Sequence, residues 1–270
     1  MLQFYYEILI KIFFHNYFPL KIFKICVHKI EEIISRLIDI KAGGNYKNHV
    51  TVILAVTGSG NKLPPILIFK GKSDKINERR YNKLDVVRNK KIFIFFQENA
   101  WVNDSIFKNW IDLVFKEHEK NLKDKCLLLL DKAPSHITKN VLSYFKSNQI
   151  EYILIPARLT RFLQPLDIGV NFPFKTYLKN KYLINEANKL TNNNEVNPIK
   201  FNDNLSYSNL DILRLNLIYW ILLIWEDDDI IKLSTIIASF NKATITFPLD
   251  GSFDNKFEMP EEIIKQHNKE

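Results

Sequence analysis

The order of apolar and polar residues divides the chain into short β-branched runs and longer segments with apolar residues at helical spacing. The apolar runs at residues 49–56 and 63–72 flank a polar turn that contains Gly58 and Gly60. Two β-branched runs joined by a glycine-containing turn are typical of a β-hairpin. We therefore predict two antiparallel strands over this part of the chain.

A basic segment at residues 73–91 follows the hairpin and shows no periodicity, so we predict that it is irregular. A short apolar run at residues 92–96 comes next. Residues 102–122 then carry apolar side chains at helical spacing, after a polar cap at Asn103 or Asp104. These features predict a strand followed by an amphipathic helix.

Four consecutive leucines, Leu127 to Leu130, end on Asp131. A continuous apolar run of this length fits a strand that is buried on both faces. Asp131 would then lie at the carboxyl end of the strand, where α/β sheets place their ligands. The alternative is that Asp131 only starts a turn, since aspartate is common in turns and Pro134 follows.

The rest of the chain continues the alternation of helices and strands. We predict, in order, an amphipathic helix at 137–149, a buried strand at 150–157, a loop at 158–169, a helix at 171–190, a polar loop or linker at 191–208, and two helices within 210–243. The acidic run at 226–229 is interpreted as a solvated helix start and not as a metal site. This order predicts an α/β fold, with a mixed sheet flanked by helices.

The first 27 residues are apolar and aromatic but are interrupted by charged or polar side chains. These are Glu7, Lys11, His15, Lys21 and Lys24. We predict one or two helices, or a helix and then a strand, with Pro19 as the break. No membrane span and no signal peptide is expected from this pattern.

Composition supports a folded core and a polyanionic partner. Hydrophobic residues make up 46% of the chain and charged residues 25%, which excludes a disordered chain. The net charge is +8, and residues 41–100 alone hold twelve lysines and arginines against four acids. This local surplus indicates either a nucleic-acid-binding surface or a solvated loop. Cys26 and Cys126 lie far apart and outside any Cys/His cluster, so we expect buried thiols, with no zinc site and no disulfide.

Four separated blocks resemble, in the same order, the DDE superfamily endonuclease domain of pogo/Tigger-like transposases, a group that includes jerky-type and centromere protein B-type derivatives. The blocks are HVTVILAVTGSGNKLPPILIFKGK, LLLLDKAPSH, IEYILIPARLTRFLQPLDIGVNFPFK and SFNKATITFPLDGSFDN. The resemblance covers residues 42–255 and implies a ribonuclease H-like fold. It also implies three carboxylates that hold two divalent metal ions, Mg²⁺ or Mn²⁺, to cut and rejoin DNA.

The resemblance places two of the three carboxylates on this sequence. By position in the blocks they are Asp131 and Asp167, separated by 35 residues, and both are expected to be catalytic metal ligands. Mg²⁺ prefers carboxylate and water oxygens, and two such ions can activate a nucleophile and stabilise a leaving oxygen. His136 and Gln164 are near these acids in sequence. They would either contact substrate or the metal ligands, or only pack within the turn and the loop.

The family's first carboxylate, on a central first strand, has no recognisable counterpart. The upstream acids are Glu7, Glu31, Glu32 and Asp39, and none lies in a strand of the expected kind. We therefore expect a ribonuclease H-like fold whose first strand and first catalytic carboxylate are missing from the pattern. A gap in the sheet would leave backbone groups unpaired, so KIFKICV, residues 21–27, is the candidate to fill it. The hairpin is then expected beside the leucine strand, or one strand away from it.

The family pattern also divides the chain. We predict an unrelated N-terminal segment at 1–41, the core of the DDE domain at 42–190, a polar loop at 191–208, C-terminal helices of the same domain at 209–255, and a tail at 256–270. Full-length family members carry a helix-turn-helix DNA-binding module before the catalytic domain, and none is recognisable here. The chain therefore resembles a truncated transposon remnant.

With one of three metal ligands missing, we expect defective catalysis and residual, non-specific association with the phosphate backbone of DNA. The residues expected to contact DNA are Lys70, Lys72, Lys75, Arg79, Arg80, Lys83, Arg88, Lys90 and Lys91. The alternatives are a domesticated DNA- or chromatin-binding protein without catalysis, and a transposon remnant without function. The resemblance implies a nuclear location.

Overall fold

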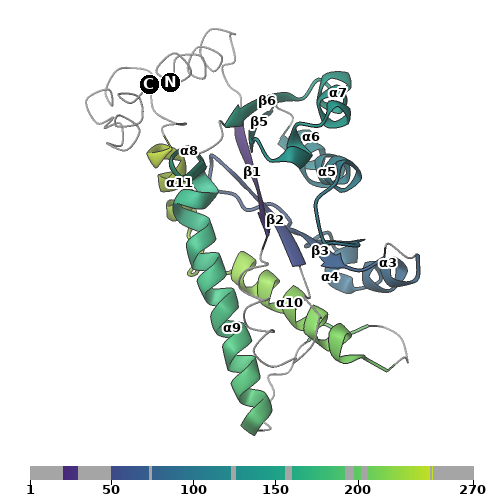
Figure 1. Cartoon of the computed structure of the whole chain (residues 1–270). Coiled ribbons are helices and arrows are strands. Elements are labelled where there is room, and N and C mark those ends of the chain that lie inside the picture. Colours follow the sequence, from purple (N-terminus) through teal and green to yellow (C-terminus); the bar gives the residue numbers. More distant parts are fainter. Residues whose placement is uncertain are drawn as a thin grey trace, which may run out of the picture.

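The computed structural model describes residues 21–29, 50–72, 75–122, 126–155, 160–191, 198–201, 206–243 and 245. Within these residues, one six-stranded mixed sheet has the order β4-β3-β2-β1-β5-β6 (Figure 1). The strands are β1 (Lys21–Lys29), β2 (Val50–Thr57), β3 (Ile66–Lys70), β4 (Phe93–Gln97), β5 (Cys126–Asp131) and β6 (Glu151–Ile155). Helices cover both faces of this sheet, which confirms the predicted α/β class.

The strand β1 occupies the centre of the sheet. It pairs antiparallel with β2, where Cys26 lies opposite Leu54, and parallel with β5, where Lys21 lies opposite Cys126. β2 and β3 form the predicted antiparallel hairpin, one strand away from β5. A central strand with the hairpin on one side and β5 on the other is the ribonuclease H-like arrangement. The strand that the sequence pattern lacked is thus supplied by the KIFKICV segment, as predicted.

The described helices lie between these strands and after them. They are α3 (Lys75–Asn82), α4 (Asp85–Arg88), α5 (Asp104–Trp110), the π-helical turn η1 (Ile111–Phe115), α6 (Lys116–Leu122), the 3₁₀ turn η2 (Pro134–His136), α7 (Lys139–Ser147), α8 (Thr160–Leu163), the π-helical turn η3 (Leu166–Val170), α9 (Asn171–Thr191), α10 (Asn209–Glu226) and α11 (Leu233–Lys242). Four predicted helical regions are confirmed by these bounds. The predicted cap of α5 is Asn103, whose side chain accepts a hydrogen bond from the N–H of Ile106 at 2.9 Å.

The basic segment at 73–91 is not irregular as predicted, because its described part forms α3 and α4. Lysine, arginine and glutamate have good helix propensity, and neither glycine nor proline interrupts these helices. Tyr81 anchors α3: it is fully buried and contacts the rings of Phe69, Phe96 and Phe201. The segment has few apolar residues among many charged ones, so its sequence shows no helical periodicity. This explains why the prediction of an irregular segment was wrong.

The predicted loop at 158–169 is helical in its described part, where α8 and η3 lead into α9. Leu163, Leu166 and Val170 are all buried, at the spacing of one helix face. Glycine and proline in this segment indicated a loop, but proline is tolerated in the first turn of a helix. Asp167 therefore lies in the first turn of a helical segment and not in a loop.

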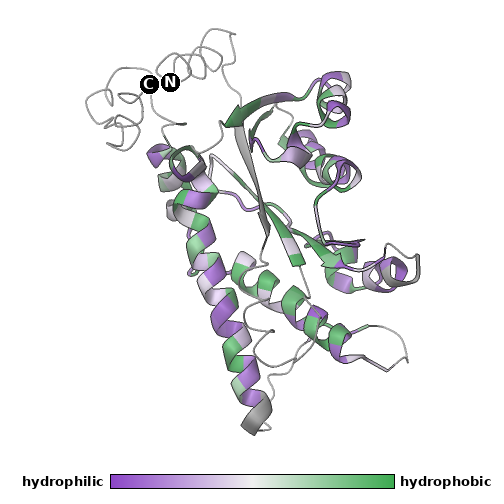
Figure 2. Ribbon diagram, viewed as in Figure 1, coloured by the Kyte–Doolittle hydropathy of each residue, from purple (hydrophilic) through white to green (hydrophobic). Residues whose placement is uncertain are grey.

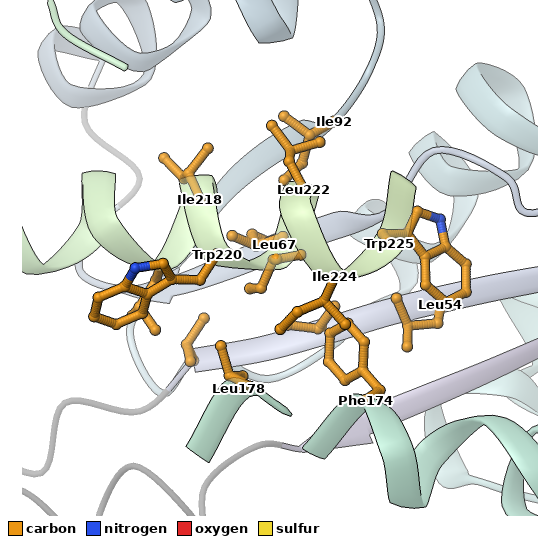
Figure 3. Packing of buried hydrophobic residues seen from close by; sticks show 14 of the residues in the cluster. Leu54, Leu67, Ile92, Phe174, Leu178, Ile218, Trp220, Leu222, Ile224 and Trp225 are labelled. Carbon is orange, nitrogen blue, oxygen red and sulfur yellow. The ribbon is translucent and has the colours of Figure 1, made fainter. Parts of the chain in front are cut away.

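The two faces of the sheet are covered by different helices (Figure 1). α5, η1 and α7 pack on one face, and α9, α10 and α11 pack on the other. α10 is coloured as hydrophobic over most of its length in Figure 2, as expected for a helix that is buried on several sides. Its residues Trp220, Leu222 and Trp225 share one buried cluster with residues of β2, β3 and α9 (Figure 3).

The acidic run at 226–229 begins at the last residue of α10 and ends this helix, so the prediction that it starts a helix was wrong. Asp227 caps the carboxyl end of α10, and Asp228 forms an ion pair with Lys62 at 2.8 Å. The indole N–H of Trp225 donates to the main-chain oxygen of Leu63 at 2.7 Å and joins the same helix end to the hairpin. None of the helices in the described ranges combines the length and apolar character that crossing a membrane requires.

Candidate active site

Asp131 is the last residue of β5, and 21% of its side chain is exposed. β5 runs parallel to both β1 and β6, and its five other residues are buried. The carboxylate therefore lies at the carboxyl edge of the sheet, as the run of leucines predicted. Its Oδ1 atom also accepts a hydrogen bond from the N–H of Ala133 at 3.1 Å, so Asp131 starts a turn as well.

His136 follows Asp131 through the turn η2, and its imidazole is completely buried. The ring stacks on Phe107 of α5 with the two ring centroids 4.6 Å apart. Its Nδ1 atom lies 2.8 Å from Oδ1 of Asp131 and 3.3 Å from the main-chain oxygen of that residue. His136 and Asp131 are therefore in direct contact.

Asp167 lies in η3 and is half-buried. Its Oδ1 atom accepts a hydrogen bond from Nδ2 of Asn171, one helical turn later, at 2.5 Å. Asn171 is itself buried, and its Oδ1 atom has no hydrogen-bond partner within the described part of the chain. Sequence reasoning did not single out Asn171. The available signal was its position four residues after Asp167, where helix side chains meet.

Gln164 lies between α8 and η3, with only 1% of its surface exposed. Its main-chain N–H donates to the oxygen of Thr160 at 2.8 Å, and its main-chain oxygen accepts from Ile168 at 3.0 Å. A side chain buried to this extent is not available to a large substrate. Whether Gln164 contacts the metal ligands or only packs within this segment stays a prediction.

Gly169 allows η3 to approach α11 closely. A Cβ atom at this position would lie 2.1 Å from Oγ of Ser239, which is itself buried. η3 also contacts β1, the neighbour of β5 in the sheet. The two candidate acids are thus carried by segments that both adjoin β1: Asp131 by the strand that pairs with it, and Asp167 by the helical turn that packs on it.

The donor set is smaller than the one that the resemblance implies. Within the described ranges, no group of three or more His, Cys, Asp or Glu side chains could hold a metal ion. The sequence of β1 contains no carboxylate, although the family's first carboxylate lies on this strand. Two carboxylates and water suit one hard cation such as Mg²⁺, but they do not fit the arrangement with two ions. That Asp131 and Asp167 lie within reach of a shared ion stays a prediction.

The cations predicted to contact DNA divide into two groups. Four of them form ion pairs: Arg80 with Asp211, Arg88 with Asp85, Lys90 with Glu117, and Lys91 with Glu226. Four others, Lys70, Lys72, Arg79 and Lys83, are exposed, and none of them forms an ion pair with another described residue. The side chain of Lys75 lies outside the described residues. The paired Arg88, Lys90 and Lys91 also keep 60%, 66% and 51% of their side chains exposed, so the second group differs from them only in having no acidic partner among the described residues.

Arg80 links α3 to α10. Its Nη1 atom donates to Oδ2 of Asp211 at 3.3 Å, and its guanidinium lies 3.9 Å from the ring centroid of Phe201. The hydroxyl of Tyr81 donates to Oδ1 of the same carboxylate at 3.1 Å, and burial raises the pKa of this hydroxyl well above its ordinary value. Burial also works to raise the pKa of Asp211, but hydrogen bonds from Ser208 and Tyr81 and the charge of Arg80 hold it below its ordinary value.

Lys70, Lys72 and Asp131 lie at the same edge of the sheet. β3 is antiparallel to β2, β2 is antiparallel to β1, and β1 is parallel to β5, so β3 and β5 run in the same direction. Lys70 ends β3 and Lys72 follows it, so both lie at the carboxyl edge, as Asp131 does. Three interstrand spacings, about 14 Å, separate β3 from β5.

The chain is similar to transposase-related proteins. A family model described as DDE superfamily endonuclease matches residues 47–240. The protein "Pogo transposable element with KRAB domain" from Mus musculus is 24% identical over 233 residues, which cover 86% of this chain and 35% of that protein. Jerky protein from Mus musculus is 26% identical over 137 residues, which cover 47% of this chain and 23% of that protein. The chain spans about a third of the length of the pogo relatives that it matches.

Solved transposase structures are similar to the chain at lower identity. A structure of the Mos1 transposase catalytic domain and raltegravir with Mn is 12% identical, with a TM-score of 0.44 over 88% of this chain and 86% of that one. The Mos1 mariner paired-end complex with Mn is 13% identical, with a TM-score of 0.46 over 94% of this chain and 61% of that one.

Proposed function

The chain belongs to the DDE superfamily of endonucleases, and from this premise we propose that it binds DNA phosphates at the carboxyl edge of its sheet without cleaving the strand. The observation that carries the proposal is the composition of β1. This strand completes the sheet, but its nine residues, KIFKICVHK, include no carboxylate. The backbone of a transposase domain is therefore retained, while one of the three acids that its chemistry needs is absent from the strand that should hold it.

Asp131 and Asp167 are the residues that would hold a single Mg²⁺ or Mn²⁺. A bound ion of this kind polarises a phosphodiester, and cleavage by displacement in this family relies on two of them. The two acids of this chain can bind and orient one cation, and through it one phosphate group. They leave the attacking and departing oxygens without a matched pair of ions, so we expect no strand cleavage.

The contacts to DNA are proposed for the four exposed cations Lys70, Lys72, Arg79 and Lys83. Lys70 ends β3 and Lys72 follows it, at the edge of the sheet that Asp131 shares, whereas Arg79 lies in α3 and Lys83 directly after this helix. Lysine and arginine contacts to phosphates give affinity without sequence preference, and each contact makes the affinity more dependent on salt. We therefore expect weak, non-specific binding that falls steeply as the salt concentration rises.

The test of DNA binding is a charge-matched pair of triple variants. The first, Lys72→Ala/Arg79→Ala/Lys83→Ala, removes three cations of the proposed surface. The control, Lys120→Ala/Lys146→Ala/Lys242→Ala, removes three exposed lysines from α6, α7 and α11. Arg80 is left intact in both, because its removal would also release α3 from α10.

We expect the first triple variant to lower the slope of log affinity against log salt by about 0.9 for each phosphate that its side chains no longer neutralise. The control should keep the wild-type slope, although it has the same net charge. Equal affinity of the two variants in filter binding on a short duplex would show that net charge alone attracts DNA, and the proposed surface would be wrong.

The absence of cleavage is tested separately with supercoiled plasmid and Mn²⁺. We expect no nicking by the wild-type chain above that of the Asp131→Asn variant. Nicking that is present in the wild type and lost in Asp131→Asn would contradict the proposed catalytic defect, while leaving the DNA-binding surface standing. Binding to DNA also implies action in the nucleus, which a fluorescent fusion of the chain would locate.

A further inference from the structure

We infer that His136 is a positioning residue that fixes the carboxylate of Asp131, and this inference rests on the proposed role of Asp131 as a ligand for one cation. The imidazole is 0% exposed, so it cannot contact DNA directly. Its Nδ1 atom lies 2.8 Å from Oδ1 of Asp131, a distance typical of a hydrogen bond to a carboxylate. His136 can therefore influence an ion or a phosphate only through Asp131.

The surroundings of the ring determine which nitrogen carries the hydrogen. The two atoms near Nδ1 are the carboxylate Oδ1 and the main-chain oxygen of Asp131, and both are hydrogen-bond acceptors. Nε2 is buried without a hydrogen-bond partner within the described part of the chain. A hydrogen on Nε2 alone would leave a buried donor without an acceptor and place two acceptors against a bare Nδ1. The hydrogen therefore lies on Nδ1, and His136 donates to Asp131.

The ring that makes this donation is held by aromatic packing. Phe107 is fully buried and stacks on the imidazole at 4.6 Å with an interplanar angle of 27°. Phe107 in turn contacts Trp110 and Phe145 on the same face of the sheet. Rotation of the imidazole would disturb this cluster, so the direction of its N–H is fixed. Oδ1 of Asp131 also accepts from the N–H of Ala133, so two donors set the plane of the carboxylate.

A carboxylate whose plane is set in advance binds a cation without first losing rotational freedom. Groups that orient a metal ligand in this way typically change metal affinity by about ten- to a hundredfold when they are removed. A merely packed histidine would affect folding but would not change the affinity of Asp131 for an ion. Measuring both the Mn²⁺ affinity and the stability of a His136 variant therefore distinguishes a positioning role from a packing role.

The experiment compares three substitutions of His136 in the full chain. His136→Asn places an amide N–H near the position of Nδ1, His136→Leu fills the ring volume without a donor, and His136→Gln carries its amide N–H farther out, toward the position of Nε2. Mn²⁺ affinity is measured by electron paramagnetic resonance, with Asp131→Asn as the reference. The side-chain rotamer of Asp131 is determined from crystal structures of the variants, and urea unfolding checks that the fold is intact.

We expect Mn²⁺ affinity within about threefold of wild type for His136→Asn and a loss of about tenfold or more for His136→Leu and His136→Gln. Asp131 should keep its rotamer in His136→Asn and change it in the other two. Equal Mn²⁺ affinity and an unchanged rotamer in a folded variant without the donor would overturn the positioning role. If Asp131→Asn itself leaves Mn²⁺ binding unchanged, the proposed cation site fails, whereas the rotamers still decide on His136. If His136→Leu does not fold, His136→Gln alone decides between these outcomes.

Discussion

Asp131 and Arg80 are both charged, both partly buried and both candidates from the sequence, yet the structure uses them differently. Asp131 contacts Ala133 and His136, which lie two and five residues away in the sequence. Arg80 contacts Asp211, an opposite charge 131 residues away in the sequence. The local contacts orient Asp131 at an open edge of the sheet, while the distant contact neutralises Arg80 and joins two helices.

This comparison shows that a count of charges in a segment does not define a binding surface. Four of the nine candidate cations are engaged by acids that lie on the same helix or on other elements. Lys91, for example, is paired with Glu226 at the end of α10 at 2.9 Å. The partners of a charge, and not its sign alone, determine whether it is available to DNA.

The largest expected effect concerns the anchor of the basic helix α3. Tyr81→Ala should lower the free energy of unfolding by about 3–5 kcal/mol, because a fully buried aromatic ring is removed from the contacts with Phe69, Phe96 and Phe201. Tyr81→Phe keeps the ring and loses the hydroxyl with its contacts to Asp211 and Arg214, so a loss of about 1 kcal/mol is expected. Urea unfolding measures both. Equal losses would show that the hydroxyl, and not the ring, holds α3.

Adjacent arginines of α3 provide the next test. Arg80→Ala should lower the free energy of unfolding by about 1.5–3 kcal/mol, since it removes a charged hydrogen bond to Asp211 and the contact with Phe201. Arg79 is exposed, so Arg79→Ala should change stability by less than about 0.5 kcal/mol. DNA affinity at low salt should show the opposite order, with the larger loss for Arg79→Ala. The same order in both measurements would remove the distinction between the structural and the exposed cation.

The next prediction concerns η3, which carries Asp167, and tests its close approach to α11. Gly169→Ala should lower the free energy of unfolding by about 1–3 kcal/mol, because the new Cβ overlaps with Oγ of Ser239. Gly71→Ala is the control, since its Cβ would make only ordinary contacts, with Phe96 at 3.4 Å and with Nη2 of Arg214 at 3.7 Å. Thermal and urea unfolding should separate the two variants. Similar stability would mean that Ser239 can move aside and that η3 is not held by this contact.

The smallest effect expected is a dependence on pH at Asp211. Its pKa is lowered in the folded chain, so its ionised form contributes stability that is fully present above the ordinary value of 3.8 and is lost as the pH falls through the folded value. The stability difference between wild type and Asp211→Asn should therefore be constant near neutral pH and shrink below about pH 4. Urea unfolding across this range measures it. A difference that grows on acidification would contradict the assigned interaction with Arg80 and Tyr81.

Most strands and the longer helices could be predicted because their signal is local. The hairpin and β5 follow from continuous β-branched or leucine runs, and α5 follows from helical spacing after the cap at Asn103. The position of Asp131 at a strand end follows from the same run. β1 was predicted on different grounds, that an empty central slot would leave backbone groups unpaired.

The rest depended on contacts that leave no local pattern. α3 is held by Tyr81 and Arg80, and their shared partner Asp211 lies far along the chain. η3 was hidden by proline and glycine, although Leu163, Leu166 and Val170 recur at helical spacing and could have indicated it. The buried contact between His136 and Phe107 joins two elements, so the sequence could place His136 near Asp131 but could not show what fixes its ring.

The two donors that orient Asp131, Ala133 and His136, lie with it in six consecutive residues. In evolution, the hydrogen bonds within such a short segment can persist while substitutions accumulate elsewhere in the domain. The pairing of β1 with β2 and β5 uses its backbone, so the sheet ladder itself does not require an acid on this strand. A lineage that no longer cuts DNA would then lose its first acid early and keep the turn around its second acid long after selection for cleavage had ended.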